Sequence, residues 1–289
     1  MNFSIDFMKH RKLFLAISAM IMAGSLLIFM IRGLSLSIDF TGGNVIQVQL
    51  NEESSISVGE VREVVGEVLQ TNAMIQEFGE SAFIIRTQDD EEDTRAKLID
   101  ALKLKYANME VIGFEKVGPV VGAELRHDAF VGMIIALIAI LIYITVRFQF
   151  RFAVVSVLAL IHDTVAVIGA FSLTGLEVNA TFIAAVLTIV GYSLNNTIII
   201  IDRIRENWKE LRSKKIVKLV NESINQTLSR TIYTTLTTIL PVIALYIWGG
   251  PVLLSFSFAF LVGIIFGTFS SICISTSLIV VWWLWKPID

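Results

Sequence analysis

Long apolar runs and short polar windows alternate along the chain. Six runs are long enough to cross a bilayer, because about 20 apolar residues span the ~30 Å of hydrocarbon. We therefore expect membrane-spanning helices at 13–31, 128–147, 152–173, 178–201, 231–248 and 252–281. The first run is longer than the apolar core of a cleaved signal peptide, which has about 7–15 residues. It is therefore predicted to be an uncleaved signal anchor.

The last apolar run continues to Trp285, which is long for one perpendicular crossing. We expect a single crossing, followed by a segment at 282–289 that tryptophans anchor at the membrane interface. Gly263 and Gly267 have the GxxxG spacing that permits close contact between helices. This motif alone is a weak signal of a packing face.

Basic residues gather on one side of the predicted spans. They precede the first span, flank the turn between the second and third, and fill the segment 202–230; the first of them are Lys9, Arg11, Lys12, Arg147 and Arg151. The two short loops on the opposite side contain no Lys or Arg. By the positive-inside rule the basic side is cytoplasmic, so we expect segment 1–12, loop 202–230 and the C-terminus there.

The polar segment 32–127 is predicted to form an extracytoplasmic domain, and its acidic residues outnumber the basic ones. Its periodicity predicts the order strand, helix, strand, strand, helix, strand, at 44–50, 58–70, 74–78, 82–87, 91–106 and 110–117. This is the order of a ferredoxin-like α+β domain, a fold that hosts many functions and identifies none. We interpret the acidic run 89–93 as a solvated helix start, in preference to a cation site.

Polar side chains inside the predicted spans point to transport, because such groups are costly in hydrocarbon and usually face protein or water. Asp163 lies near the middle of the third span, directly after His162. It is either a neutral, hydrogen-bonded packing residue or a protonatable member of a relay. Neighbouring residues of a helix point about 100° apart, so His162 and Asp163 need not share a site.

The fourth span contains two adjacent amides, Asn195 and Asn196. An amide forms hydrogen bonds and orients water, but it carries no proton at physiological pH. The alternative is that these amides connect helices by hydrogen bonds. The span ends in a charged group that marks its cytoplasmic edge and includes Asp202, Arg203 and Arg205.

Arg230 begins the fifth span and is either an anchor at the membrane edge or a buried cation that faces the fourth span. A polar stripe follows it at helical spacing, formed by Thr231, Thr234, Thr235 and Thr238. The stripe either lines water or packs against another helix.

Composition excludes several classes of protein. A hydrophobic content of 55% and a mean hydropathy of +0.73 exclude an ordinary soluble domain. The single cysteine and the three histidines have no ligand spacing, so neither a metal site nor a disulfide is predicted. Because no nucleophile–base pair or phosphate-binding loop occurs, we expect neither an enzyme nor a cofactor. Acidic residues interrupt the basic loop, which indicates topology and anionic-lipid contact, not nucleic-acid binding.

Several motifs, in order along the chain, resemble those of the SecF family of bacterial protein-export subunits, within the RND superfamily. The first consists of Asp39, Phe40, Thr41, Gly42 and Gly43, and further matches occur at 161–163, 191–195, 202–207, 227–231, 249–251 and 270–271. The resemblance implies an RND-type half with six transmembrane helices in the bacterial inner membrane. It also implies an obligate heterodimer with SecD, often joined by YajC. That complex uses the proton motive force to promote translocation of unfolded polypeptides through SecYEG.

One position departs from the family pattern. The family usually has Gly-Tyr-Ser-x-Asn-Asp, with the aspartate implicated in proton conduction, and this chain has Asn196 there. If the resemblance holds, Asp163 or carboxylates of SecD would carry the proton. Arg230 matches the family's functional arginine. Two alternatives stay open: a passive scaffold beside a proton-conducting SecD, and half of an RND-type exporter of small molecules, which the single extracytoplasmic domain disfavours.

Overall fold

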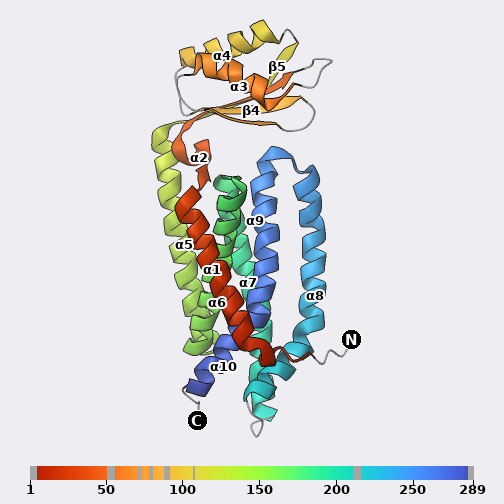
Figure 1. Cartoon of the computed structure of the whole chain (residues 1–289). Coiled ribbons are helices and arrows are strands. Elements are labelled where there is room, and N and C mark those ends of the chain that lie inside the picture. Colours follow the sequence, from red (N-terminus) through yellow and green to blue (C-terminus); the bar gives the residue numbers. More distant parts are fainter. Residues whose placement is uncertain are drawn as a thin grey trace. The chain divides into compact units, whose positions relative to one another are not determined.

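The computed structural model describes residues 5–50, 56–69, 73–77, 81–87, 92–106, 108–210 and 216–285 (Figure 1). The chain divides into two compact units. Met1–Ser35 and Val131–Asp289 form one, here called the helical unit, and Leu36–Phe130 forms the other, here called the sheet unit.

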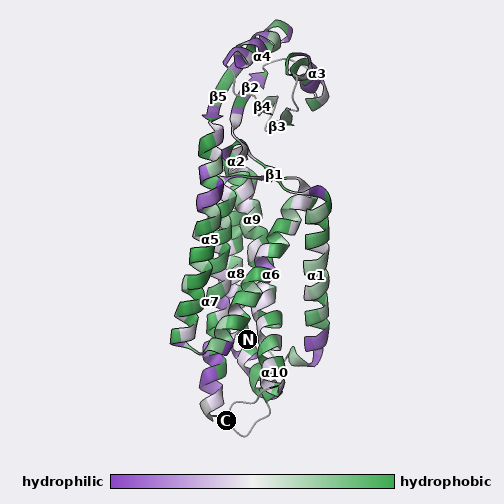
Figure 2. Ribbon diagram, turned by 90° about the vertical axis from the view of Figure 1, so that its left-hand side faces the viewer, coloured by the Kyte–Doolittle hydropathy of each residue, from purple (hydrophilic) through white to green (hydrophobic). Residues whose placement is uncertain are grey.

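The described residues contain six helical stretches that are long and apolar enough to cross a membrane (Figure 2). They are α1 (Arg11–Arg32), α5 (Pro119–Arg147), α6 (Phe150–Thr174), α7 (Ala180–Glu210), α8 (Ile216–Trp248), and the run of α9 (Gly250–Phe269), η2 (Ser270–Ser275) and α10 (Thr276–Trp285). The first residues of α5 belong to the sheet unit. Shorter elements are η1 (Met8–His10), β1 (Ser35–Leu36) and β6 (Glu177–Val178).

Several helices extend beyond the predicted apolar runs. α7 continues to Glu210 and α8 begins at Ile216, so the segment 202–230, expected as a loop, is mostly helical. The extensions are amphipathic, and their apolar side chains, such as Ile204 and Leu219, are buried in a cluster at this end of the bundle. The basic positions 212, 214 and 215 lie outside the described residues.

The last apolar run is one continuous helical stretch that ends at Trp285, beyond the predicted end at 281. Its middle segment, η2, has π-helical geometry. Such segments are rare inside α-helices and occur frequently at functional sites. Residues 286–289 lie outside the described part of the chain.

α6 and α7 form the centre of the helical unit. In their most apolar windows 61% and 50% of residues are buried, against 6% in α1 and α5. α9 packs tightly on α7, because a Cβ atom at Gly263 would overlap the Ile189 side chain and one at Gly267 would lie 3.1 Å from Ser193 Cβ. The close helix contact that the GxxxG spacing permits is therefore present between α9 and α7.

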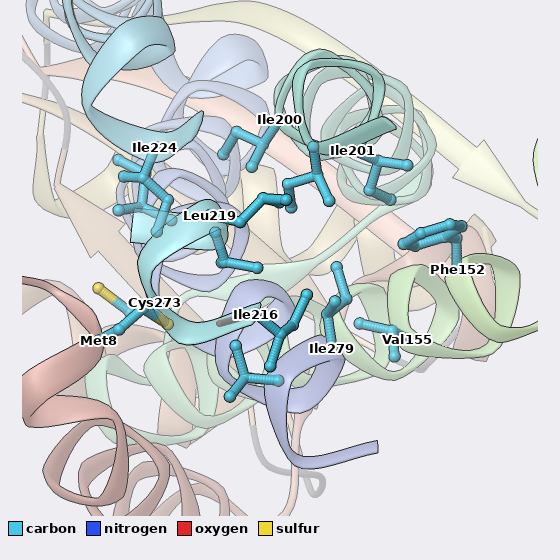
Figure 3. Packing of buried hydrophobic residues seen from close by; sticks show 14 of the residues in the cluster. Met8, Phe152, Val155, Ile200, Ile201, Ile216, Leu219, Ile224, Cys273 and Ile279 are labelled. Atoms are coloured by element: carbon cyan, nitrogen blue, oxygen red, sulfur yellow. The ribbon is translucent and has the colours of Figure 1, made fainter. Parts of the chain in front are cut away.

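A hydrophobic cluster closes one end of the helical unit. It contains side chains from η1, α6, α7, α8, η2 and α10, among them Met8, Phe152, Val155, Ile200, Ile201, Ile216, Leu219, Ile224, Cys273 and Ile279 (Figure 3). The segment before α1 is fastened to α8 in the same region. Asn225 Oδ1 accepts a hydrogen bond from Ile5 N at 2.9 Å, and Asn221 Nδ2 donates to Ile5 O at 3.0 Å.

The sheet unit has the element order that the sequence predicts. Its elements are β2 (Gly43–Leu50), α3 (Val58–Val68), β3 (Met74–Glu77), β4 (Ala82–Thr87), α4 (Glu92–Lys105) and β5 (Met109–Val117). The antiparallel sheet has the order β3-β4-β2-β5. Ile46 pairs with Ile85 and Val48 with Phe83, and these residues are buried in one core with side chains of α3 and α4.

The acidic run at 89–93 lies partly outside the described residues. Its last residue, Asp93, stands in the first turn of α4 and forms a 2.6 Å ion pair with Lys97, and both side chains are largely exposed. This part of the run agrees with a solvated helix start.

Glycine is required at the turn between the short helix α2 (Ile38–Thr41) and β2. Gly42 has φ = 75° and ψ = 163°, a conformation that residues with a Cβ atom rarely adopt. A Cβ atom at Gly42 would lie 2.8 Å from Pro119 Cα, and one at Gly122 would lie 3.0 Å from Phe40 O. The motif that begins at Asp39 thus packs its backbone directly against the start of α5.

Candidate functional site

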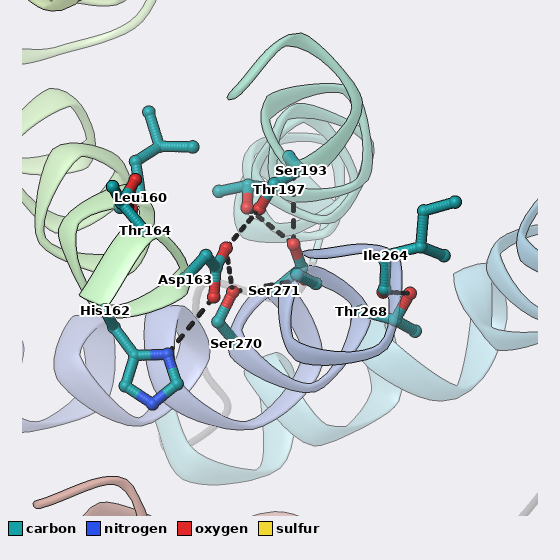
Figure 4. A network of polar contacts seen from close by, with 11 residues as sticks. Leu160, His162, Asp163, Thr164, Ser193, Thr197, Ile264, Thr268, Ser270 and Ser271 are labelled. Atoms are coloured by element: carbon teal, nitrogen blue, oxygen red, sulfur yellow. Dashed lines mark hydrogen bonds and ion pairs between the residues drawn. The ribbon is translucent and has the colours of Figure 1, made fainter. Parts of the chain in front are cut away.

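A buried carboxylate lies where three helical segments meet. Asp163 of α6 is 0% exposed, and its Oδ2 atom accepts hydrogen bonds from two hydroxyl groups (Figure 4). Ser193 of α7 donates at 2.7 Å and Ser270 of η2 donates at 2.8 Å. A single side chain therefore joins α6, α7 and η2.

Two further hydroxyl groups, those of Ser271 and Thr197, connect η2 to α7 beside this carboxylate. Ser271 donates to the backbone carbonyl of Ser193 at 3.2 Å, and its Oγ atom lies 2.8 Å from Thr197 Oγ1. Two successive serines of the π-helical segment thus reach two different helices, since Ser270 contacts α6 and Ser271 contacts α7. Small side chains at these positions allow η2 to approach both helices closely.

His162 belongs to the same site. Its Nδ1 atom lies 3.1 Å from Asp163 Oδ1, and the ring is 1% exposed between the rings of Phe266 and Phe269. The sequence left open whether the two residues share a site, and the structure brings them together. His162 Nε2 has no hydrogen-bond partner among the described residues. The site therefore places an imidazole group and a carboxyl group in direct contact.

The structure separates the two adjacent amides of α7. Asn195 is exposed on the surface of the chain, whereas Asn196 is 0% exposed, one helical turn from Ser193. Neither Oδ1 nor Nδ2 of Asn196 has a hydrogen-bond partner within the described residues, so the alternative of an interhelical hydrogen bond is not found there. A buried amide without partners is rare in native proteins and calls for a functional explanation.

Arg230 does not join this network. It lies exposed on α8, where its carbonyl accepts a hydrogen bond from Thr234 at 2.8 Å. The threonine stripe packs against neighbouring helices at its buried position Thr235, which lies 3.1 Å from Thr268 of α9 and 3.4 Å from Tyr192 of α7. Thr231, one turn earlier, is 1% exposed. These contacts favour packing over the lining of a water path.

The charged end of α7 forms a separate group. Arg203 contacts Glu206 at 2.7 Å and donates to Gln226 of α8 at 2.6 Å, and Arg205 lies 4.0 Å from Asp202. These side chains are partly exposed, so they are surface contacts between helix ends.

Sequence reasoning assigned no site role to the residues that provide the hydroxyl groups. Ser193, Ser270 and Ser271 entered only as parts of the family motifs, and Thr197 was not named. Hydroxyl side chains in spans often bond to their own helix, as Ser156 and Thr164 do here, so their presence alone does not mark a site. Asn207 was likewise named only within the motif at 202–207, although it is 3% exposed and donates a hydrogen bond from α7 to Ser223 of α8 at 2.8 Å.

The described residues contain no group of three or more His, Cys, Asp or Glu side chains that could bind a metal ion.

Two family descriptions match the chain. "Protein export membrane protein SecD/SecF, C-terminal" matches residues 97–285, and "SecD/SecF GG Motif" matches residues 27–53. The second match includes the turn at Gly42, and the first includes every residue of the buried network.

Individual proteins agree with these matches. The protein translocase subunit SecF of Calditerrivibrio nitroreducens is 40% identical over 285 residues, which are 96% of this chain and 93% of the relative. The protein translocase subunit SecDF of Thermus thermophilus is 40% identical over 260 residues, 87% of this chain and 35% of the relative. The crystal structure of a Thermus SecDF, described as a translocon-associated membrane protein, has a TM-score of 0.88 and 39% identity. The match covers 96% of this chain and only 38% of that SecDF chain.

Proposed function

Because this chain belongs to the SecD/SecF family of protein export membrane proteins, we propose that it couples the protonation of a buried carboxylate to polypeptide export. In the SecDF relative a SecD part and a SecF part belong to one chain, and this protein matches only about a third of it. This implies that a separate SecD chain is the partner of this protein. The proposed setting is the bacterial inner membrane, with SecYEG as the channel, YajC as an accessory subunit and both termini in the cytoplasm. The sheet unit is proposed to be an extracytoplasmic ferredoxin-like domain, since its strand order is β3-β4-β2-β5.

The observation that carries this proposal is the position of Asp163. Its ionised form accepts charge-assisted hydrogen bonds from Ser193 and Ser270, which are about twice as strong as neutral ones. A proton on Asp163 therefore weakens the contacts that hold α7 and η2 to α6. This is a physical route from proton binding to helix movement.

Two chain connections join the helical unit to the sheet unit, so movement of the helices can be transmitted to it. The chain enters that unit from α1 and leaves it through α5, whose first turns belong to it. We propose that a change in the packing of the spans moves the sheet unit through these two connections. The moving domain would then hold or release an emerging unfolded polypeptide.

Two further residues have proposed roles beside Asp163. Asn196 cannot carry a proton, and its amide has no partner among the described residues, so it is proposed to bind and orient water in the buried site. Arg230 is exposed on this chain and is therefore available to neutralise a carboxylate of the SecD partner.

The proposal predicts that export depends on a proton gradient. We expect proteoliposomes with SecYEG, SecD and this chain to translocate an unfolded substrate faster when a proton gradient is imposed. A protonophore should remove the increase, and liposomes with SecYEG alone control for direct effects on the channel. Equal rates with and without the gradient would refute the proposal.

Replacement of Asn196 by aspartate separates this proposal from the passive scaffold. The substitution places a second titratable group on the buried face of α7, so we expect Asn196→Asp to raise proton flux across proteoliposomes of the SecD-containing complex. Asn195→Asp is a matched control, because it adds the same charge at an exposed position one residue away. Equal flux in all three proteins would show that position 196 takes no part in proton conduction, which favours the passive scaffold.

A further inference from the structure

One nitrogen of the His162 ring is not used by the buried network. Nδ1 lies 3.1 Å from Asp163 Oδ1, whereas Nε2 has no hydrogen-bond partner among the described residues, although the side chain is buried. Figure 4 shows the ring pointing away from the hydroxyl groups of Ser193 and Ser270. A buried polar atom without a partner costs free energy, so Nε2 requires a partner from another part of the helical unit.

α1 is the helix that can supply this partner. It packs along α6 in the same direction, since Arg32 at its end donates to a backbone carbonyl at the end of α6 at 2.9 Å. Further along, a Cβ atom at Gly169 of α6 would overlap Ser25 of α1. Ser18 stands seven residues before Ser25, and the histidine ring stands seven residues before Gly169. Seven residues are about two helical turns, so Ser18 lies on the contact face of α1 at the level of His162.

Ring contacts place the same face of α1 beside the imidazole. The ring centres of Phe14 and Phe269 are 6.3 Å apart, and Phe269 lies 6.4 Å from the ring of His162. Residues four apart share one face of a helix, so Ser18 lies on the same side of α1 as Phe14. The structure describes every residue of α1, and Ser18, at 6% exposed, is the one that is buried. The most enclosed position of this apolar helix is therefore a hydroxyl group.

We propose that the hydroxyl group of Ser18 is the hydrogen-bond partner of His162 Nε2, either directly or through one bridging water molecule. A hydroxyl group suits this position because it donates to a neutral ring nitrogen and accepts from a protonated one. Ser18 is thus a positioning residue, which holds the imidazole beside Asp163 in both states of the ring.

This contact adds a fourth helix to the buried site. α1 is the span from which the chain enters the sheet unit, so a change at His162 would act on the helix that leads there. The use of this contact in export rests on the proposed function. The contact itself does not, and it is measurable without any export assay.

Nitrogen NMR of the histidine ring tests the contact. The chain has three histidines, so this chain, made with isotope-labelled histidine and assembled with unlabelled SecD, gives few ring signals. The signals that disappear in His162→Gln identify His162. We expect Ser18→Ala to shift the Nε2 resonance of His162, because the hydrogen bond is lost. A cross-peak between water and Nε2 that disappears in the same variant shows that a water molecule bridges the two side chains, and a shift without such a cross-peak shows a direct bond.

Two matched variants make the result specific. Ser25→Ala is the same change on the same face of α1, but it lies against Gly169 and should leave the His162 signals in place. Ser18→Thr keeps the hydroxyl group and should keep the Nε2 resonance close to its original position. Copurification of SecD shows that each variant is assembled. An unchanged Nε2 resonance in Ser18→Ala, or an equal shift in Ser25→Ala, would overturn the proposal.

Discussion

Replacement of Asp163 by asparagine is expected to reduce gradient-driven export to the rate measured without a gradient. Asparagine has the size of aspartate, and its Oδ1 atom still accepts a hydrogen bond, but the side chain cannot bind and release a proton. Ser193 and Ser270 both donate to the carboxylate, so the helices should stay assembled while the proton-dependent change is lost. The measurement is translocation into proteoliposomes with and without an imposed gradient.

A control variant separates this effect from a general loss of charge. Asp202→Asn removes a half-exposed carboxylate at the end of α7 and should leave gradient-driven export near its normal rate. Copurification of SecD with each variant shows whether the complex is intact. If Asp163→Asn assembles and still exports in a gradient-dependent manner, the proton carrier lies on SecD and the role of Asp163 is structural.

Replacement of Gly42 by valine is expected to destabilise the sheet unit by about 3 kcal/mol or more. The backbone of Gly42, at φ = 75° and ψ = 163°, costs a residue with a Cβ atom about 1–3 kcal/mol. The new Cβ atom also lies 2.8 Å from Pro119 Cα and 2.9 Å from Pro119 N, which are backbone atoms that cannot rotate away. Hydrogen exchange of the β2 amides in the intact chain should therefore accelerate about 100-fold, since about 1.4 kcal/mol corresponds to tenfold.

Gly66 provides the matched control for this prediction. It lies within α3 of the same unit, and a Cβ atom there meets nothing within 4 Å. Gly66→Ala should slow exchange, because alanine in a helix is more stable than glycine by about 1 kcal/mol. Unchanged β2 protection in Gly42→Val would show that the turn relaxes and that the close contact with Pro119 is dispensable.

The sequence predicted most of the elements but not all of their ends. Each apolar run is much longer than the few residues by which its ends are uncertain, so the six spans were clear from the sequence. The element order of the sheet unit followed from the spacing of its apolar residues, which alternates between the two-residue period of a strand and the 3.6-residue period of a helix. Amphipathic extensions such as the one that contains Ile204 are polar enough to resemble a loop, and they become helical because their apolar faces are buried in a cluster shared by several segments.

For the candidate site, the sequence indicated which polar residues are unusual in a span, but it did not indicate which residues form hydrogen bonds with them. Asp163 and His162 stood out because charge and polarity are rare in a span. The roles of Ser193 and Ser270 were hidden, because many hydroxyl groups in this chain bond only to their own helix. The difference between Asn195 and Asn196 was also hidden, since two adjacent amides have the same local sequence and opposite exposures.

The sequence by itself determined that this protein has six apolar spans, a separate unit of strands and helices, and the motifs of a protein-export family. These features depend on residue type and spacing, which are local properties. Only the tertiary structure decided which polar groups meet. The contact of Ser270 with Asp163 joins residues 107 positions apart, and it exists because Gly267 and the π-helical segment let the last span approach α6 and α7. Helix periodicity places a side chain on a face, but the packing of three helices decides what that face touches.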